Sequence, residues 1–188
     1  MKTITAIASI GAIVVLFMGI GFSQSLSEWL MKPGGSPPVI THWYASEELH
    51  HGDIWKIYLG AKDPDGDMIN FVILFDQQGF GVYSPGYVVI KKQHRGELRG
   101  YLRWFSTSGD GLSLPEWTRV NVTIFIRDKG GNISNKVAFP LVLSRGTKQG
   151  PPPPPFDNGP LDKLGTIMVD LLDPNRDSAS ETEPWWIK

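Results

Sequence analysis

The sequence predicts an all-β domain, an antiparallel β-sandwich of about seven strands, between an apolar N-terminal segment and a proline-rich tail. Three observations lead to this prediction. Between residues 37 and 144, apolar and polar residues alternate with a period of two, as in half-buried strands. Clusters of Gly, Pro, Asn and Asp separate these runs and are typical of turns. No stretch between them has the helical apolar spacing that a crossover between parallel strands requires.

The 188-residue chain divides by composition into three parts, residues 1–35, 36–146 and 147–188. A formal net charge of −1 argues against nucleic acid as a partner. The chain contains no cysteine, which excludes disulfide scaffolds, thiolate metal sites and cysteine nucleophiles.

The first part, 1–35, holds an almost unbroken apolar run over residues 4–22. As a helix, this run would extend roughly 28 Å, close to the hydrocarbon thickness of a bilayer. It is either an uncleaved transmembrane anchor or a cleaved secretory signal, and we favour the signal-anchor because the run is long for a signal. We therefore expect a single-pass cell-membrane protein whose bulk is extracytoplasmic, in the periplasm or at the cell surface. If the segment is cleaved, the protein is secreted.

The central part, 36–146, is predicted to contain all seven strands. One alternates between Val120, Val122 and neighbouring polar residues, and another is a continuous apolar run. Pro140 lacks a backbone N–H donor, so its strand should lie at a sheet edge there. The predicted strands span residues 39–44, 54–59, 68–75, 87–90, 98–104, 120–126 and 137–143.

Two turns carry a family resemblance. The sequence DPDGD at 63–67 and the sequence DKGGNIS at 128–134 resemble signatures of bacterial extracytoplasmic Ig-like and cadherin-like domains. The resemblance covers about residues 37–144 and implies an Ig-like β-sandwich. Such modules serve as spacers, adhesion units and accessory domains, so the resemblance narrows the fold more than the function.

The acidic turn is a candidate calcium site, because carboxylates at alternate positions gather the hard oxygen ligands that Ca²⁺ prefers. The resemblance to cadherin-like domains also implies calcium binding. An EF-hand is excluded, because Met68 and Leu74 occupy the positions that need glycine and glutamate. The alternative, which we favour, is a β-turn whose aspartates bond their own backbone. The candidate ligands are Asp63, Asp65, Asp67 and Asp128.

No catalytic motif stands out. The chain lacks a G-x-S-x-G elbow, an H-E-x-x-H pair and a phosphate-binding loop, so we expect no enzymatic activity and no cofactor apart from the calcium alternative. Arg99, Tyr101 and Arg103 alternate along one predicted strand. They form either a basic aromatic stripe for an acidic partner or glycan, or an ordinary polar outer face.

The third part, 147–188, begins with five prolines at 151–155, which favour an extended spacer. Apolar residues over 161–172 then recur at helical spacing and predict a short amphipathic helix. Its apolar face and two late tryptophans need a surface, which is another protein, this chain's own sandwich or the bilayer. The predicted partner-binding residues are Leu161, Leu164, Ile167, Met168, Leu171, Leu172, Trp185 and Trp186.

These features together favour a non-catalytic, membrane-anchored extracytoplasmic protein. Its expected role is that of a structural or accessory subunit of an envelope or membrane complex, acting through protein–protein contacts of the tail. Deletion of residues 151–188 should then leave the sandwich folded. The alternative is a calcium-dependent or glycan-binding adhesive module.

Overall fold

The computed structural model describes residues 34–106, 116–144 and 149–173. These residues form an all-β domain with one short 3₁₀ helix, and the apolar N-terminal segment lies outside them. The strands are β1 (Val39–Tyr44), β2 (Glu48–Leu49), β3 (Ile54–Lys62), β4 (Met68–Gln77), β5 (Gly81–Val82), β6 (Gly86–Val89), β7 (Glu97–Phe105), β8 (Arg119–Asp128), β9 (Val137–Leu143) and β10 (Asp162–Ile167), with η1 (Lys92–His94) between β6 and β7.

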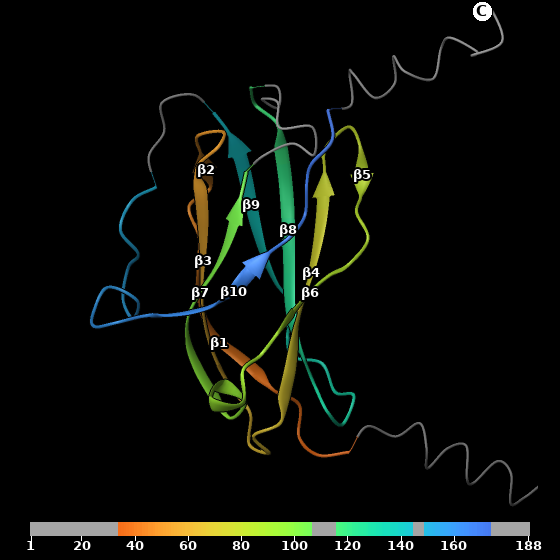
Figure 1. Ribbon diagram of the computed structural model, residues 1–188, viewed down its shortest axis with the longest axis vertical. Helices are drawn as coiled ribbons and strands as arrows, with labels where there is room; N and C mark the ends of the chain where they lie inside the picture. The colour runs from red at the N-terminus through yellow and green to blue at the C-terminus, as the bar shows by residue number, and fades with distance from the viewer. Residues whose placement is uncertain (1–33, 107–115, 145–148, 174–188) are drawn as a thin grey trace, which may run out of the picture. The chain divides into compact units, whose positions relative to one another are not determined.

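The strands form two sheets that pack face to face (Figure 1). Sheet A has the order β1-β3-β7-β10, and sheet B has the order β2-β9-β8-β4-β5, with β6 also paired to β4. Aromatic rings join the sheets, since Trp55 lies 6.4 Å from Phe139 and Phe75 lies 5.2 Å from Trp104 between ring centroids. The apolar alternation read from the sequence therefore marks the inner faces of two sheets.

All seven predicted strands are present. Along β3 and β4 several buried residues follow one another, whereas buried and outward-facing residues alternate along β7, β8 and β9. On β8, for example, Val120, Val122 and Ile124 are buried, while Arg119 and Asn121 face outward. The position of Pro140 is also confirmed, because β9 is flanked on its outer side only by the two-residue β2.

The prediction of a purely antiparallel fold is wrong, since both sheets are mixed. Strand β2 pairs in parallel with β9, and β10 pairs in parallel with β7. In the second case the chain leaves β9 in sheet B and returns along sheet A through the proline-rich segment. A connection of that length can join strands that run in the same direction.

The predicted amphipathic helix over 161–172 is also wrong, because this segment contains β10. A bulge lies between Lys163 and Gly165, where the register against β7 shifts by one residue. Leu164 and Ile167, three residues apart, are therefore both buried, although a regular strand would turn them to opposite faces. The bulge gives a strand the apolar spacing of a helix, so periodicity alone could not distinguish them.

The prolines do not hold the tail away from the domain, as we predicted they would. Phe156, directly after them, is buried against Tyr58 on the outer face of sheet A, with ring centroids 5.6 Å apart. Arg99 donates hydrogen bonds to the carbonyls of Pro155 and Asn158, the second at 2.7 Å. Deletion of 151–188 would therefore remove both β10 and core side chains, so the expectation that it leaves the sandwich folded is corrected.

Candidate functional site

The chain enters and leaves the described domain at opposite ends of β4. Near its entry, the Ser36 N–H donates to the carboxylate of Asp65, in the turn before β4. Near its exit, Leu172 is bonded to Gln77, the last residue of β4. The ten residues of β4 separate these points by about 33 Å. We call the Asp65 end proximal and the Gln77 end distal; in Figure 1 they lie at the bottom and the top.

Three hydrogen bonds tether the exit. The side chain of Gln77 donates to the Leu172 carbonyl (2.8 Å), and the Leu172 N–H donates to the Tyr83 hydroxyl (2.9 Å). That hydroxyl in turn donates to the Gln77 amide oxygen. Gln77 is buried, and these partners satisfy both ends of its amide. The position of the chain at residue 172 is therefore determined by side chains of the distal end.

A groove of about 530 Å³ lies at the distal end of sheet B. Its floor includes Asp76, Asn121 and Pro140, which face one another across β4, β8 and β9. Phe80, in the turn between β4 and β5, forms part of its wall. The groove has the size of a ligand or side-chain pocket and mixes apolar surface with a few polar groups.

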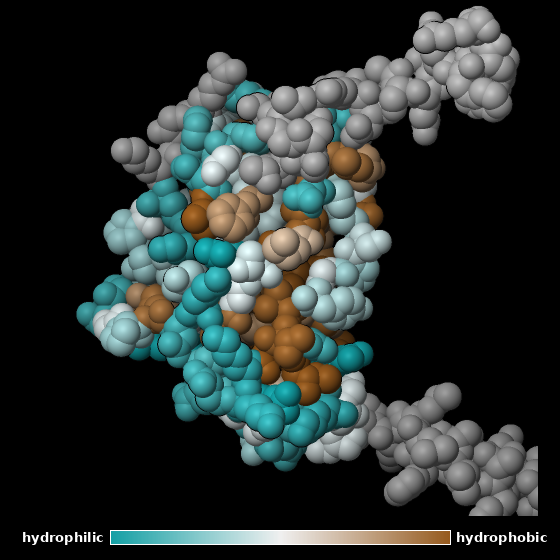
Figure 2. Space-filling view, viewed as in Figure 1, coloured by the Kyte–Doolittle hydropathy of each residue, from teal (hydrophilic) through white to brown (hydrophobic). Residues whose placement is uncertain are grey.

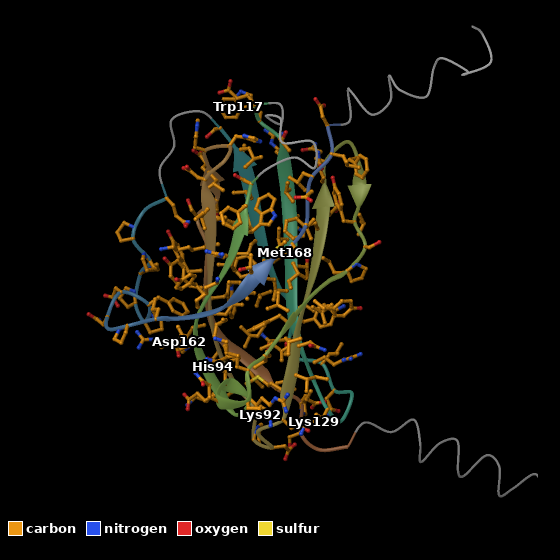
Figure 3. All side chains as sticks on the ribbon, viewed as in Figure 1. Lys92, His94, Trp117, Lys129, Asp162 and Met168 are labelled. Carbon is orange, nitrogen blue, oxygen red and sulfur yellow. The ribbon has the colours of Figure 1, made fainter. Side chains whose placement is uncertain are left out.

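Trp117 stands at the same end, just before β8, and is labelled at the top of Figure 3. Its side chain is 62% exposed, and its backbone φ is 70°. A positive φ is unfavourable for a residue with a bulky side chain, so the surrounding structure has to hold it. The Trp117 N–H donates to the Leu143 carbonyl at 2.7 Å, which helps to keep this conformation.

A second exposed apolar surface lies on the side of the domain, where β6 and β10 approach each other. Figure 2 shows apolar residues gathered down the middle of this face. Met168 is 86% exposed, Val89 68% and Tyr87 61%. Apolar side chains grouped in this way are typical of contact surfaces.

The predicted partner-binding residues separate into three groups. Leu164, Ile167 and Leu171 belong to the domain's own core, which corrects their assignment to a partner. Leu161 is half-buried, and Met168 and Leu172 are exposed. Trp185 and Trp186 lie outside the described residues. The physical reason for the correction is that this segment pairs with β7 as β10 and does not form a helix. Leu164 and Ile167 on β10, and Leu171 just after it, then face the core between the sheets.

The two acidic turns meet at the proximal end, as the calcium hypothesis required. The Lys129 N–H donates to the Asp67 carbonyl (3.2 Å). The carboxylates, however, have partners of their own: Asp63 accepts the N–H groups of Asp65 (3.2 Å) and Asp67 (3.0 Å), and Asp128 accepts two bonds from Asn132, both 2.8 Å. Among the described residues, no three His, Asp or Glu side chains are arranged to hold a metal ion.

Asp67 differs from its neighbours. One of its carboxylate oxygens is buried with no hydrogen-bond partner among the described residues. Partial desolvation raises the pKa of Asp67, and the nearby carboxylates of Asp128 and Asp63 raise it further. The negative charge of Asp67 is therefore unfavourable in the folded state.

The basic aromatic stripe on β7 is engaged within the chain. Arg99 binds the carbonyls after the prolines, and Arg103 donates to the Thr166 hydroxyl on β10 at 3.0 Å. The Lys56 ammonium lies 5.2 Å from the centre of the Tyr101 ring. These contacts fit the polar outer face better than a free glycan surface.

Sequence reasoning missed the distal groove and Trp117. The groove depends on cross-strand neighbours from three strands, and only the pairing register brings Asp76, Asn121 and Pro140 together. A tryptophan in a polar turn-rich stretch, beside Glu116 and Arg119, was the available signal for Trp117.

Comparison of the chain with protein-family models, curated proteins and solved structures gives no significant match. Within the part of the chain that the structure describes, no helix has the length and apolar character to cross a bilayer.

Proposed function

We propose that this chain is a non-catalytic accessory subunit of a membrane or envelope complex. Its apolar N-terminal segment anchors it, and its Ig-like extracytoplasmic domain presents a protein-binding surface at its distal end. The main support for the proposal is that the chain enters and leaves the domain at opposite ends. The N-terminal segment leads into the proximal end, and the tail begins at the distal end, about 33 Å away.

The exposed side chains support a contact surface at the distal end. Trp117, Phe80 and the groove all lie there, and tryptophan and other aromatic residues are enriched at the centres of protein interfaces. The lateral surface of Met168, Val89 and Tyr87 supplies further apolar area on the same domain.

The proline-rich segment contributes differently from the expected spacer. It covers the outer face of sheet A and leads into β10, so the tail that remains for partner contact begins after Asp173 rather than after the prolines.

The test uses the full-length chain in its native membrane with two matched variants. Phe80→Arg changes a 43% exposed distal side chain, and Ile133→Arg changes a 48% exposed side chain in the proximal turn. After chemical crosslinking in the intact membrane, we expect Phe80→Arg to lose the partner adduct of the wild type and Ile133→Arg to retain it.

Anchoring is tested separately. The chain should stay in the membrane fraction after alkaline extraction, and its domain should be cut by protease added from the extracytoplasmic side. Release by alkaline extraction contradicts the anchor. Equal adducts from both variants contradict the distal surface.

A further inference from the structure

We propose that the distal groove of sheet B is a docking site for the chain's own residues 184–188, Pro-Trp-Trp-Ile-Lys. The inference concerns the tail to which the proposed function assigns partner contact. It adds that, before any partner binds, the tail is held on the domain in cis.

The residues that precede the tail already pack on the domain. Phe156, Leu164 and Leu171 all pack on the domain, although each lies beyond the prolines that the sequence predicts to be a spacer. The described part of the C-terminal region, up to Asp173, therefore returns to the two sheets along sheet A, and Met168 is the most exposed large apolar residue within it.

The described chain ends next to the groove. Leu172 is bonded to the side chain of Gln77, and Gln77 is one of the residues that line the groove, together with Phe80 and Gly81. Fifteen residues follow Asp173, of which ten precede Pro184. Ten residues span up to roughly 33 Å when extended, which is more than enough to pass around one edge strand to the outer face of sheet B.

The groove and the tryptophans of the tail are chemically complementary. Phe80, Pro140 and Val142 offer apolar surface, and Asp76 and Asn121 offer side-chain acceptor oxygens at the same groove. An indole needs this combination, since it has a large apolar body and one N–H donor. A tryptophan at 185 or 186 meets both requirements within a groove of about 530 Å³.

The outer faces of the two sheets support the same proposal. The chain's own residues 155–158 cover the outer face of sheet A through Phe156 and the bonds from Arg99. Sheet B has no such covering segment among the described residues, yet the chain leaves the domain beside it. The one strongly apolar segment that follows is 185–187.

Disulfide trapping tests the proposal. Because the chain has no native cysteine, only the introduced cysteines can form a disulfide. In full-length chain in detergent, Lys188→Cys is combined with Asn121→Cys in the groove. The matched control is Lys188→Cys with Arg127→Cys, because Arg127 is exposed on the same face of β8, six residues or roughly 20 Å away. Both positions lie within reach of the tail, and the alanine variants below separate docking from the shorter path between Leu172 and residue 121.

We expect the groove pair to form an intramolecular disulfide about tenfold faster than the control pair, because docking raises the local concentration of residue 188 at the groove. Replacing Trp185 and Trp186 by alanine in the same pair should remove this preference. Equal rates for the two pairs overturn the proposal, and so does a purely intermolecular disulfide, which would place the tail on a second copy. The measurement needs neither membrane nor partner. Docking of the tail can therefore be disproved while the proposed function stands, and the proposed function can be disproved while docking stands.

Discussion

Gln77 and Leu172, 95 residues apart in the sequence, are joined by a 2.8 Å hydrogen bond from the Gln77 amide to the Leu172 carbonyl. Gln77 ends β4, a strand of sheet B, whereas Leu172 follows the last strand, β10. This bond places the exit of the chain at the distal end, and the first prediction follows from it.

Tyr83→Phe removes the hydroxyl that bridges Leu172 and Gln77. It leaves a buried amide with one partner fewer, so we expect a loss of about 1–2 kcal/mol in the free energy of unfolding. Hydrogen exchange at the Leu172 amide should also accelerate. Tyr87→Phe, on a 61% exposed side chain, is the control and should change neither quantity measurably.

Gly100→Ala tests the contact between β7 and β10. A Cβ at residue 100 would meet the backbone carbonyl of Asp162, which cannot rotate away. We expect a destabilisation of about 1–3 kcal/mol in a denaturant titration. Gly150→Ala has open space around the added Cβ, so it should leave the midpoint unchanged. A neutral Gly100→Ala would contradict the close packing of β10.

Leu171→Ala and Met168→Ala distinguish the strand from the helix that the sequence predicted. Leu171 is completely buried, and its truncation should cost about 2–5 kcal/mol. Met168 is exposed, and its truncation should change stability by less than about 0.5 kcal/mol. Similar effects of the two substitutions on thermal unfolding would argue against the observed burial.

Truncation after Asp173 and truncation after Gly150 should differ sharply. The first removes none of the core side chains in the described domain, so cooperative unfolding should persist. The second removes β10, Phe156 and three core side chains, so we expect loss of the cooperative transition in thermal unfolding monitored by circular dichroism. A folded product of the second truncation would show that β10 is dispensable.

Asp67→Asn should stabilise the domain at neutral pH. The pKa of Asp67 is raised in the folded state, so the folded state holds its proton more tightly than the unfolded state does. The contribution of Asp67 to the stability of the wild type therefore falls as pH rises from about 3.9, the ordinary pKa of aspartate, through the raised folded pKa. The gain from Asp67→Asn should be present at pH 7 and should vanish below about pH 3.9.

Melting temperatures of wild type and Asp67→Asn across pH provide this measurement. Calcium addition to the wild type is a useful companion, because a ligand that binds only the folded state must raise the melting temperature. A calcium-dependent rise that Asp67→Asn abolishes would reverse our preference for a self-bonded turn and support the adhesive-module alternative.

The sequence alone predicted the parts of the fold that depend on local pattern. Period-two alternation and one continuous apolar run located all seven predicted strands, and Pro140 indicated an edge because a missing N–H is a local property. The acidic turns at 63–67 and 128–134 were recognised from their residues. Their placement at one end follows from the antiparallel pairing of β4 with β8.

Only the tertiary structure decided what the C-terminal region does. Its apolar spacing is that of a helix, but β7 has a free edge and Gly100 allows a backbone to approach it, so the segment pairs as β10 with a bulge at Leu164. The segment directly after the prolines contacts Tyr58 and Arg99 for a similar reason, since burying Phe156 outweighs extension into water. The distal groove likewise exists only through register across β4, β8 and β9. Contacts between residues far apart in the sequence have no periodic signature, so they become visible only when the chain is folded.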